Sequence, residues 1–372
     1  MSSMQVPLYN LSPVLPIMAL GLVLALAPLL WVTLRKAQSK PGTRLRALTW
    51  ATLFLTLDLI LFGAFTRLSD SGLGCPDWPG CYGEASPLAA HAPIVAAQTA
   101  MPSGPVTVSK AWVEMVHRYL ATAVGALITV LMVASWVAMW RKAKPSTWRN
   151  WLPTLTFFWV CAQGAFGALT VTMKLFPAIV SLHLLGAYVL LALLTLQSAP
   201  EPAPGTAAPR LAATPWIAAA LLLLVVQAAS GAWVSTNYAV LACSEFPMCQ
   251  GQWWPGMDFA RGFELWRPLG ESADGTVLSL QAITAIHVAH RTLAMVTALV
   301  LGTLAWHLLR YPLLRQSAQW LGSLVFLQLV TGLSNVVLGW PMVAAILHTG
   351  GAACMVAVLV WMLALGRTRV IE

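Results

Sequence analysis

The stretch AWVEMVHRYLATAVGALITVLMVASWVAMW, residues 111–140, decides the class of fold. After Arg118 it contains no charged residue, and the apolar run is long enough to cross a bilayer as a helix. Because backbone groups inside a membrane must satisfy their own hydrogen bonds, such a run predicts a helix rather than a strand. The chain contains further runs of this kind, and the predicted spans are 13–34, 47–67, 111–140, 151–173, 177–198, 214–236, 281–309, 315–338 and 341–366.

Composition excludes a soluble globular protein. Hydrophobic residues make up 59% of the 372 residues and charged residues 9%, whereas soluble domains carry about 25% charged residues. The net charge of +9 does not indicate nucleic acid, because the basic residues gather in loops on one side of the predicted membrane, which the positive-inside rule makes cytoplasmic. Loops 68–110 and 237–280 and the N-terminus are then expected outside, and the C-terminus inside. The basic residues concerned are Arg35, Lys36, Lys40, Arg44, Arg46, Arg141, Lys142, Lys144, Arg149, Arg310, Arg315, Arg367 and Arg369.

An internal repeat organises the chain. MVHRYLA (115–121) corresponds to VAHRTLA (288–294), and matching residues flank both segments in the same order. These matches pair Gly63, Ala64, Cys75, Pro79, Cys81, Gln163, Gly167, Val171, His183 and Gly186 with Gly231, Ala232, Cys243, Pro247, Cys249, Gln328, Gly332, Val336, His348 and Gly351.

The repeat predicts an all-α integral membrane protein of two pseudo-twofold-related four-helix bundles plus one extra N-terminal helix. Both copies start on the same side, so the repeat is parallel, with its axis along the membrane normal. The expected divisions are residues 1–46 (extra helix and loop), 47–198 (N-terminal half), 199–213 (a Pro/Ala-rich cytoplasmic linker), 214–366 (C-terminal half) and 367–372 (tail).

Four histidines are expected at one depth in this architecture. His117 and His183 are paired in the first copy, and His290 and His348 repeat the pair in the second. Two neutral imidazoles facing each other across a bundle suit bis-histidine ligation of haem iron. The alternatives are hydrogen bonds that join helices and zinc, for which each pair lacks further ligands.

Charged residues beside these histidines differ between the copies. Arg118 and Arg291 follow the histidines and could bind haem propionates or extend to lipid headgroups; Arg67 is a further propionate candidate. Glu114 lies three residues before His117, on the same helix face, where a carboxyl group is a candidate proton acceptor. A structural hydrogen bond is the alternative for Glu114. Its counterpart His287 is expected to be a polar neighbour rather than a spare ligand.

Six cysteines are present. Two pairs lie in the loops expected outside, where disulfides persist. Two separate disulfides are therefore predicted, with a four-cysteine metal site or a redox-active pair as alternatives; the pairs are Cys75 with Cys81 and Cys243 with Cys249. Cys161 and Cys354 fall in predicted helices and are expected in the core.

The run GAFTRLSDSGLGCPDWPGCYG (63–83), with EMVHR (114–118), VAHR (288–291), SLH (181–183) and ILH (346–348), resembles the haem A synthase family. The resemblance covers about 47–366. It implies an enzyme that oxidises the C8 methyl of haem O to a formyl group, giving haem A for terminal oxidases. The family has eight helices in two similar halves, so the extra first helix is a departure.

The resemblance also implies roles for the residues. Haem b would be the cofactor of the C-terminal half, held by His290 and His348, and haem O would lie between His117 and His183. Glu114 matches the carboxylate implicated in the oxidation. The partners implied are membrane lipid, a haem O synthase and an electron acceptor for which a quinone is a candidate, and a homo-oligomer is a candidate assembly. The absence of an Arg/Ser-rich leader favours a bacterial plasma membrane.

Two other classes of protein remain open. A dihaem b-type electron-transfer protein would use the four histidines equally well, but gives no reason for Glu114 to differ from its counterpart His287. A transporter is suggested by the duplicated bundles, but no matching pair of helices is broken by Gly or Pro at mid-membrane.

Overall fold

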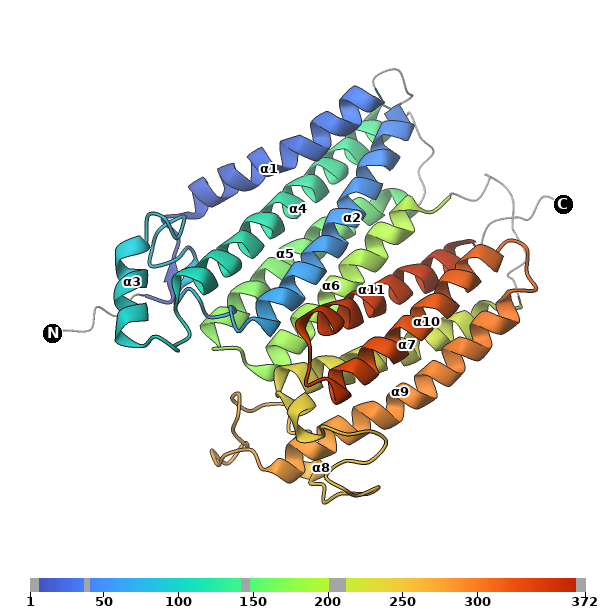
Figure 1. Ribbon diagram of the computed structural model, residues 1–372. Helices are drawn as coiled ribbons and strands as arrows, with labels where there is room; N and C mark the ends of the chain where they lie inside the picture. Colours follow the sequence, from blue (N-terminus) through green and yellow to red (C-terminus); the bar gives the residue numbers. More distant parts are fainter. Residues whose placement is uncertain (1–6, 37–40, 142–147, 201–211, 366–372) are drawn as a thin grey trace. The chain divides into compact units, whose positions relative to one another are not determined.

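The computed structural model describes residues 7–36, 41–141, 148–200 and 212–365, and the chain forms two compact units, residues 1–175 and 176–372 (Figure 1). The predicted class, an all-α integral membrane protein, is confirmed: among the described residues, nine helices are long and apolar enough to cross a membrane. The predicted linker lies mostly, and the tail wholly, outside the described residues. So do Lys40, Lys142, Lys144, Arg367 and Arg369.

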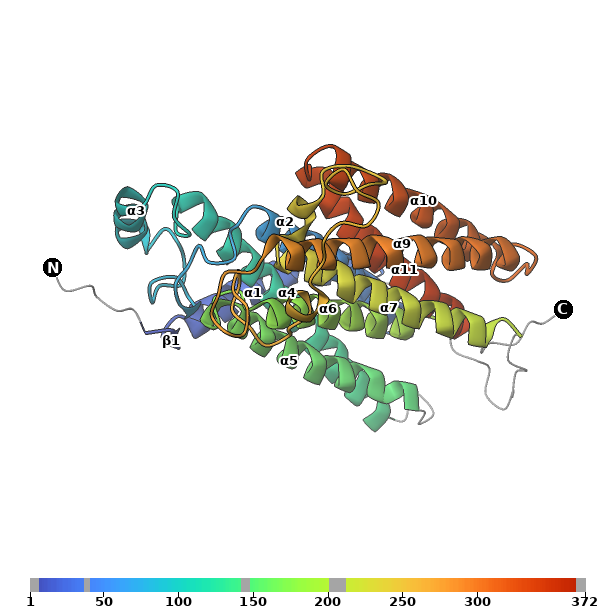
Figure 2. The same ribbon diagram turned by 90° about the horizontal axis from the view of Figure 1, so that it is seen from below.

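The first unit is built around one long helix. Helix α4 packs against α1, α2 and α5, and α1 also packs against α2. The short helix α3 lies beside the start of α4, at the end of the unit where α1 begins (Figures 1 and 2). The elements are β1 (Tyr9–Asn10), α1 (Val14–Arg35), α2 (Pro41–Leu68), β2 (Trp78–Pro79), α3 (His91–Ala100), α4 (Val108–Trp140), the 3₁₀ turn η1 (Trp148–Trp151) and α5 (Leu152–Thr172).

In the second unit, four helices close a ring. Helix α7 packs against α9, α9 against α10, α10 against α11, and α11 against α7, while α6 packs on α7 and α11. Helices α9 and α11 are therefore diagonal partners in the ring. The elements are α6 (Pro177–Ser198), α7 (Thr214–Thr236), the 3₁₀ turn η2 (Ala239–Ala242), α8 (Phe259–Gly262), α9 (Leu280–Leu308), α10 (Arg315–Val337) and α11 (Met342–Leu365).

Local chemistry sets where these helices begin. Thr107 and Ser279 cap α4 and α9, their hydroxyls accepting from the backbone N–H of Lys110 and Ala282. Proline stands in the first turn of α5, α6 and α7, where its missing N–H costs nothing. The helices that carry His117 and His290 therefore both begin at a capped residue, ten and eleven positions before the histidine.

Large apolar side chains lie exposed along the helices, for example Leu15 at 77%, Leu222 at 67% and Leu299 at 68%. Such faces suit contact with lipid. They also explain why one prediction was wrong. Cys161 is exposed rather than in the core, and Cys354 is partly exposed, because an apolar helix in a membrane needs no polar outer face to mark its buried side.

Candidate functional site

His290 of α9 and His348 of α11 approach each other across the ring of the second unit. His290 contacts Ser230 and Gly231 of α7, and His348 contacts Thr331 and Gly332 of α10. Their own helices are diagonal partners. The second unit thus brings together the two histidines that the sequence pairs in the C-terminal half.

The hydrogen bonds of these rings indicate which nitrogen carries the proton. Nδ1 of His290 lies 2.8 Å from Ser230 Oγ, and Nδ1 of His348 lies 3.0 Å from Thr331 Oγ1. Each hydroxyl has one proton, which Ser230 donates to Gln227 O and Thr331 to Leu327 O, both at 2.8 Å. With these protons on the carbonyl oxygens, each hydroxyl is placed to accept from Nδ1–H. This leaves the Nε2 lone pair of each ring for a metal, the tautomer that a ligating histidine needs.

Glycines lie against the same rings. A Cβ added at Gly231 would lie 3.0 Å from His290 Cε1, and one at Gly332 would lie 3.2 Å from His348 Cε1. Because these positions carry no side chain, α7 and α10 approach the imidazoles more closely than they could with any other residue there. Oriented imidazoles and close glycines form a cradle that fits bis-histidine haem ligation. In the part of the chain that the structure describes, no cluster of three or more His, Cys, Asp or Glu suits a metal ion.

His287 lies one turn before His290 and is buried, with 3% of its surface exposed. It makes a backbone hydrogen bond with Ala239 of η2. Its role as a polar neighbour rather than a spare ligand stays a prediction.

Both predicted disulfides are confirmed. Cys75–Cys81 and Cys243–Cys249 each close a loop with a Cα–Cα distance of 4.9 Å. The disulfides use all four thiols of the alternative metal site.

The two disulfide loops share one internal design. In the first, the Asp77 carboxylate accepts from the backbone N–H of Tyr82 at 2.6 Å and of Gly83 at 2.8 Å. Both donors have left-handed backbones, with φ of 52° and 76°, so two successive N–H groups converge on one anion. In the second loop Glu245, at the position of Asp77, accepts from one such group, the backbone N–H of Gly251.

The pKa of Tyr82 is also shifted in this loop. Burial raises the pKa of its hydroxyl above the usual value, and the Asp77 carboxylate raises that pKa further.

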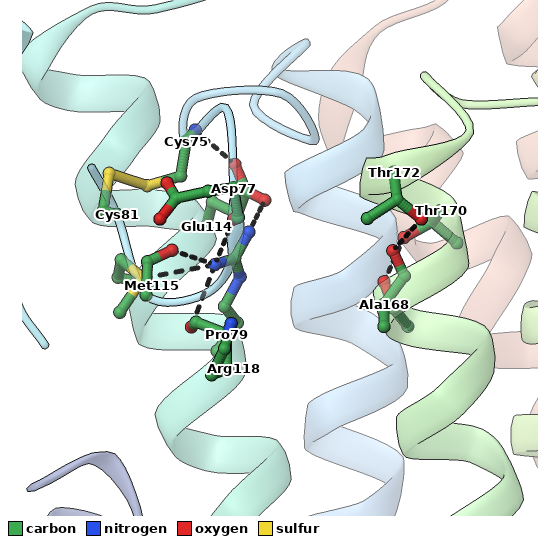
Figure 3. A network of polar contacts seen from close by, with 12 residues as sticks. Cys75, Asp77, Pro79, Cys81, Glu114, Met115, Arg118, Ala168, Thr170 and Thr172 are labelled. Atoms are coloured by element: carbon green, nitrogen blue, oxygen red, sulfur yellow. Dashed lines mark hydrogen bonds and ion pairs between the residues drawn. A yellow bond between two sulfur atoms is a disulfide. The ribbon is translucent and has the colours of Figure 1, made fainter. Parts of the chain in front are cut away.

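Glu114 and Arg118 form a buried ion pair under the first loop (Figure 3). Arg118 Nη2 donates to Glu114 Oε1 at 2.5 Å, and the backbone N–H of Cys75 donates to Oε2 at 2.8 Å. Arg118 Nη1 lies within 3.1 Å of three loop carbonyl oxygens, those of Asp77, Pro79 and Gly80. The carboxylate and the guanidinium together fix the disulfide loop to the start of α4. The expected propionate contact of Arg118 and the proton-acceptor role of Glu114 stay predictions.

Arg291 repeats half of this arrangement. It donates to Pro247 O at 2.9 Å and to Met248 O at 3.3 Å, the carbonyls that correspond to those of Pro79 and Gly80. Its guanidinium also lies 5.0 Å from the centre of the Phe246 ring. The arginine after each histidine thus holds the neighbouring disulfide loop, a role that the sequence did not indicate.

The first pair of histidines falls in different compact units. His117 of α4 stacks on Phe62, with ring centres 6.1 Å apart, and a Cβ at Gly63 would lie 3.1 Å from its Cε1. His183 lies on α6 of the second unit. Arg67, in the last turn of α2, forms an ion pair with Asp70 at 3.5 Å. The pairing of His117 with His183, and the propionate role of Arg67, stay predictions.

A family model described as cytochrome oxidase assembly protein matches residues 46–360. The chain belongs to this family. A protein named Heme A synthase from Shewanella oneidensis is 39% identical over 321 residues, which cover 84% of this chain and 94% of the relative. Proteins of the same name from Symbiobacterium thermophilum and Halalkalibacterium halodurans are 29% and 26% identical, over 82% and 78% of this chain and 90% and 86% of their own lengths.

The segment before residue 46 lies outside the family match but packs onto it. Strand β1 pairs in parallel with β2 of the first disulfide loop, and Trp78 N–H donates to Leu8 O at 3.0 Å. Ile17 of α1 is buried in one cluster with Cys75, Cys81 and Met115. The extra helix is therefore an integral part of the first unit of this family member.

Sequence reasoning missed Ser230, Thr331 and Asp77. The signal available was positional: Ser230 and Thr331 each stand directly before a glycine of the repeat, Gly231 and Gly332. In both cases the residue before the shared glycine differs between the two copies, and this difference could have indicated Ser230 and Thr331.

Proposed function

We propose that the protein is a haem A synthase, a multi-pass membrane oxidoreductase that converts the C8 methyl group of haem O to a formyl group. The observation that carries the proposal is the match to the Shewanella oneidensis protein of that name, at 39% identity over 94% of its length. The family match over 46–360 and the oriented histidines of the second unit support it.

Haem b is proposed as the resident cofactor of the C-terminal half, 214–366. Nε2 of His290 and of His348 would bind its iron, because Ser230 and Thr331 hold Nδ1 of these rings. When bound, this haem supplies one-electron redox chemistry. Arg291 contributes by fixing the disulfide loop, and its proposed contact with a propionate would add a charge-assisted hydrogen bond.

Haem O is proposed to bind in the N-terminal half, 47–198, between His117 and His183. The stacking of Phe62 on His117 supports this, because it limits how the imidazole can turn. Arg118 and Arg67 are the propionate candidates on this side.

The overall reaction balances as R–CH3 + H2O → R–CHO + 4 H⁺ + 4 e⁻, with R the porphyrin. Water supplies the oxygen, and an acceptor must take four electrons; two quinone molecules would do so. Glu114 is proposed to accept protons near the reacting methyl group. Arg118 and the Cys75 N–H each bind one oxygen of this carboxylate, so the carboxylate has a fixed direction.

The same proposal covers location and partners. We place the protein in a bacterial plasma membrane, with the N-terminus and both disulfide loops periplasmic and the C-terminus cytoplasmic, as the basic loops indicate. A haem O synthase would supply the substrate. The linker 199–213 would join the halves on the cytoplasmic side.

The test is haem extraction and chromatography from cells that make haem O and lack another haem A synthase. Wild type should yield haem A. Glu114→Gln should lower the yield about 100-fold or more, since proton transfer by a positioned side chain contributes at least about that factor. Glu84→Gln is the matched control: it removes one charge from an exposed side chain of the same loop and should leave the yield unchanged.

The dihaem electron-transfer cytochrome predicts a different result. Wild type would then give no haem A, while the purified protein would carry two b-type haems that reductant converts reversibly. That result would overturn the synthase proposal.

A further inference from the structure

The hydroxyls that hold the two histidines of the second unit have no equivalents in the first half of the repeat. Ser230 and Thr331 accept from Nδ1–H of His290 and His348 because their own protons are donated to helix carbonyls. The Gln227 amide nitrogen also lies 3.1 Å from His290 Nδ1. Turning this amide end for end would give the ring a second acceptor.

The repeat assigns a counterpart to each of these residues. Using the same registers that pair Gly63 with Gly231 and Gly167 with Gly332, Ser230 corresponds to Phe62 and Thr331 to Phe166. Gln227 corresponds to Leu59. None of the three counterparts carries a side-chain oxygen or nitrogen. In the described structure, Phe62 stacks on His117 with an angle of 7° between the rings.

We propose that this difference makes the C-terminal half hold its haem permanently and lets the N-terminal half release its haem. The inference rests on the proposed function and names the residues that set the exchange of each haem. An acceptor on Nδ1–H makes the imidazole a stronger ligand and fixes its orientation, and removal of such a partner costs about 10- to 100-fold in metal affinity. A substrate that must leave as product is better served by a half in which phenylalanine stands at the positions of both hydroxyls.

Incidental placement of the hydroxyls is the main alternative. Ser and Thr in membrane helices commonly bond to a carbonyl of their own helix. Here, however, two hydroxyls on different helices each lie at Nδ1 of a different member of one histidine pair, and both repeat counterparts are phenylalanine. The experiment separates the two explanations.

The double variant Ser230→Ala, Thr331→Val keeps the shape of both sites but removes both acceptors. Purified protein loaded with haem is mixed with excess apo-globin as a scavenger, and the transfer of haem is followed by absorbance. We expect release from the C-terminal half to be 10- to 100-fold faster than in wild type, and the reduction potential of this haem to rise, because a weaker donor ligand favours Fe(III) less.

A control variant and a rescue variant protect the test. Ser334→Ala with Thr303→Val removes the same groups from α10 and α9 at positions where, in the described part of the chain, the hydroxyls bond to carbonyls of their own helices. Release should match wild type. Thr331→Ser, which keeps the hydroxyl, should also release haem at the wild-type rate even if the double variant fails to fold. The reciprocal change Phe62→Ser should slow release from the N-terminal half.

If the double variant folds and releases haem at the wild-type rate, the inference is overturned. The proposed function would still stand in that case, provided that wild type forms haem A. Release from Thr331→Ser as fast as from Thr331→Val would overturn the inference too. Failure of the proposed function would look different, because wild-type protein would then form no haem A, whatever its rate of haem release.

Discussion

Arg118 in the first unit and Arg291 in the second make the same kind of contact, and Arg118 in addition forms a buried ion pair with Glu114. Both guanidiniums bind carbonyl oxygens of a seven-residue disulfide loop. Where Arg118 pairs with Glu114, the second unit has His287, which turns to the Ala239 backbone instead.

The comparison separates the features that occur in both copies of the repeat from those that differ. The disulfide, its anchoring arginine and the glycine against the histidine occur in both copies, so they belong to the common scaffold. The residues that differ, at the positions of Glu114 and Ser230, lie beside the histidines themselves. Under the proposed function, the two halves thus differ in the neighbours of their histidines.

The largest effect should come from removing one histidine of each half. His290→Ala deletes an iron ligand, so we expect purified protein to lose nearly all haem from the C-terminal half. His117→Ala should retain the haem of the C-terminal half, because His117 lies in the N-terminal half, whose haem is proposed to exchange. The haem-to-protein ratio and the absorbance spectrum measure both. Equal loss in the two variants would break the proposed division of roles between the halves.

A smaller effect should distinguish the two arginines. Arg118→Met leaves the buried Glu114 carboxylate without its cation, and loss of one partner of a buried pair costs about 3–5 kcal/mol. Arg291→Met loses contacts at a partly exposed position and should cost about 1 kcal/mol. Opening of each loop is measured as the rate at which its disulfide is reduced and labelled, by mass spectrometry of the separate peptides. Since about 1.4 kcal/mol is tenfold, the Cys75–Cys81 rate should rise about 100-fold or more in Arg118→Met.

In that experiment the other loop of the same molecule is the control. Each variant should change only its own loop. If Arg291→Met opened its loop as much as Arg118→Met, the carboxylate would have no special part in holding the first loop.

The smallest effect concerns the acidic residue inside each loop. Asp77→Ala removes two hydrogen bonds to a carboxylate that is fully buried, and about tenfold faster labelling of the first loop is expected. Glu245→Ala removes one bond near the surface and should change labelling of the second loop less than threefold. The reverse order would show that burial does not decide the strength of these contacts.

The sequence predicted the membrane helices closely because a bilayer demands long apolar runs. Predicted spans 177–198 and 214–236 coincide with α6 and α7. Helix α2 begins at Pro41, before the predicted 47, because Arg44 and Arg46 continue the helix beyond its apolar part. The disulfides followed from the repeat and the expected location of the loops.

Contacts between distant segments were beyond the sequence. The pairing of β1 with β2 joins residues 9–10 to residues 78–79 and leaves no local pattern. The hydroxyl of Thr331 resembles that of any serine or threonine in a membrane helix until its distance from His348 is known. The predicted roles of Glu114, Arg67 and His183 depend on a bound substrate, and so they remain to be tested.

The glycines packed against the histidines have a consequence for genetics. At Gly63, Gly231 and Gly332 an added methyl group would come within 3.0–3.2 Å of an imidazole carbon, so the ring must shift by a few tenths of an ångström. Alanine is one nucleotide away from every glycine codon. A screen of random single-base mutations for loss of haem should therefore return alleles at these glycines as well as at the histidines, although the glycines have no side chain to offer the iron.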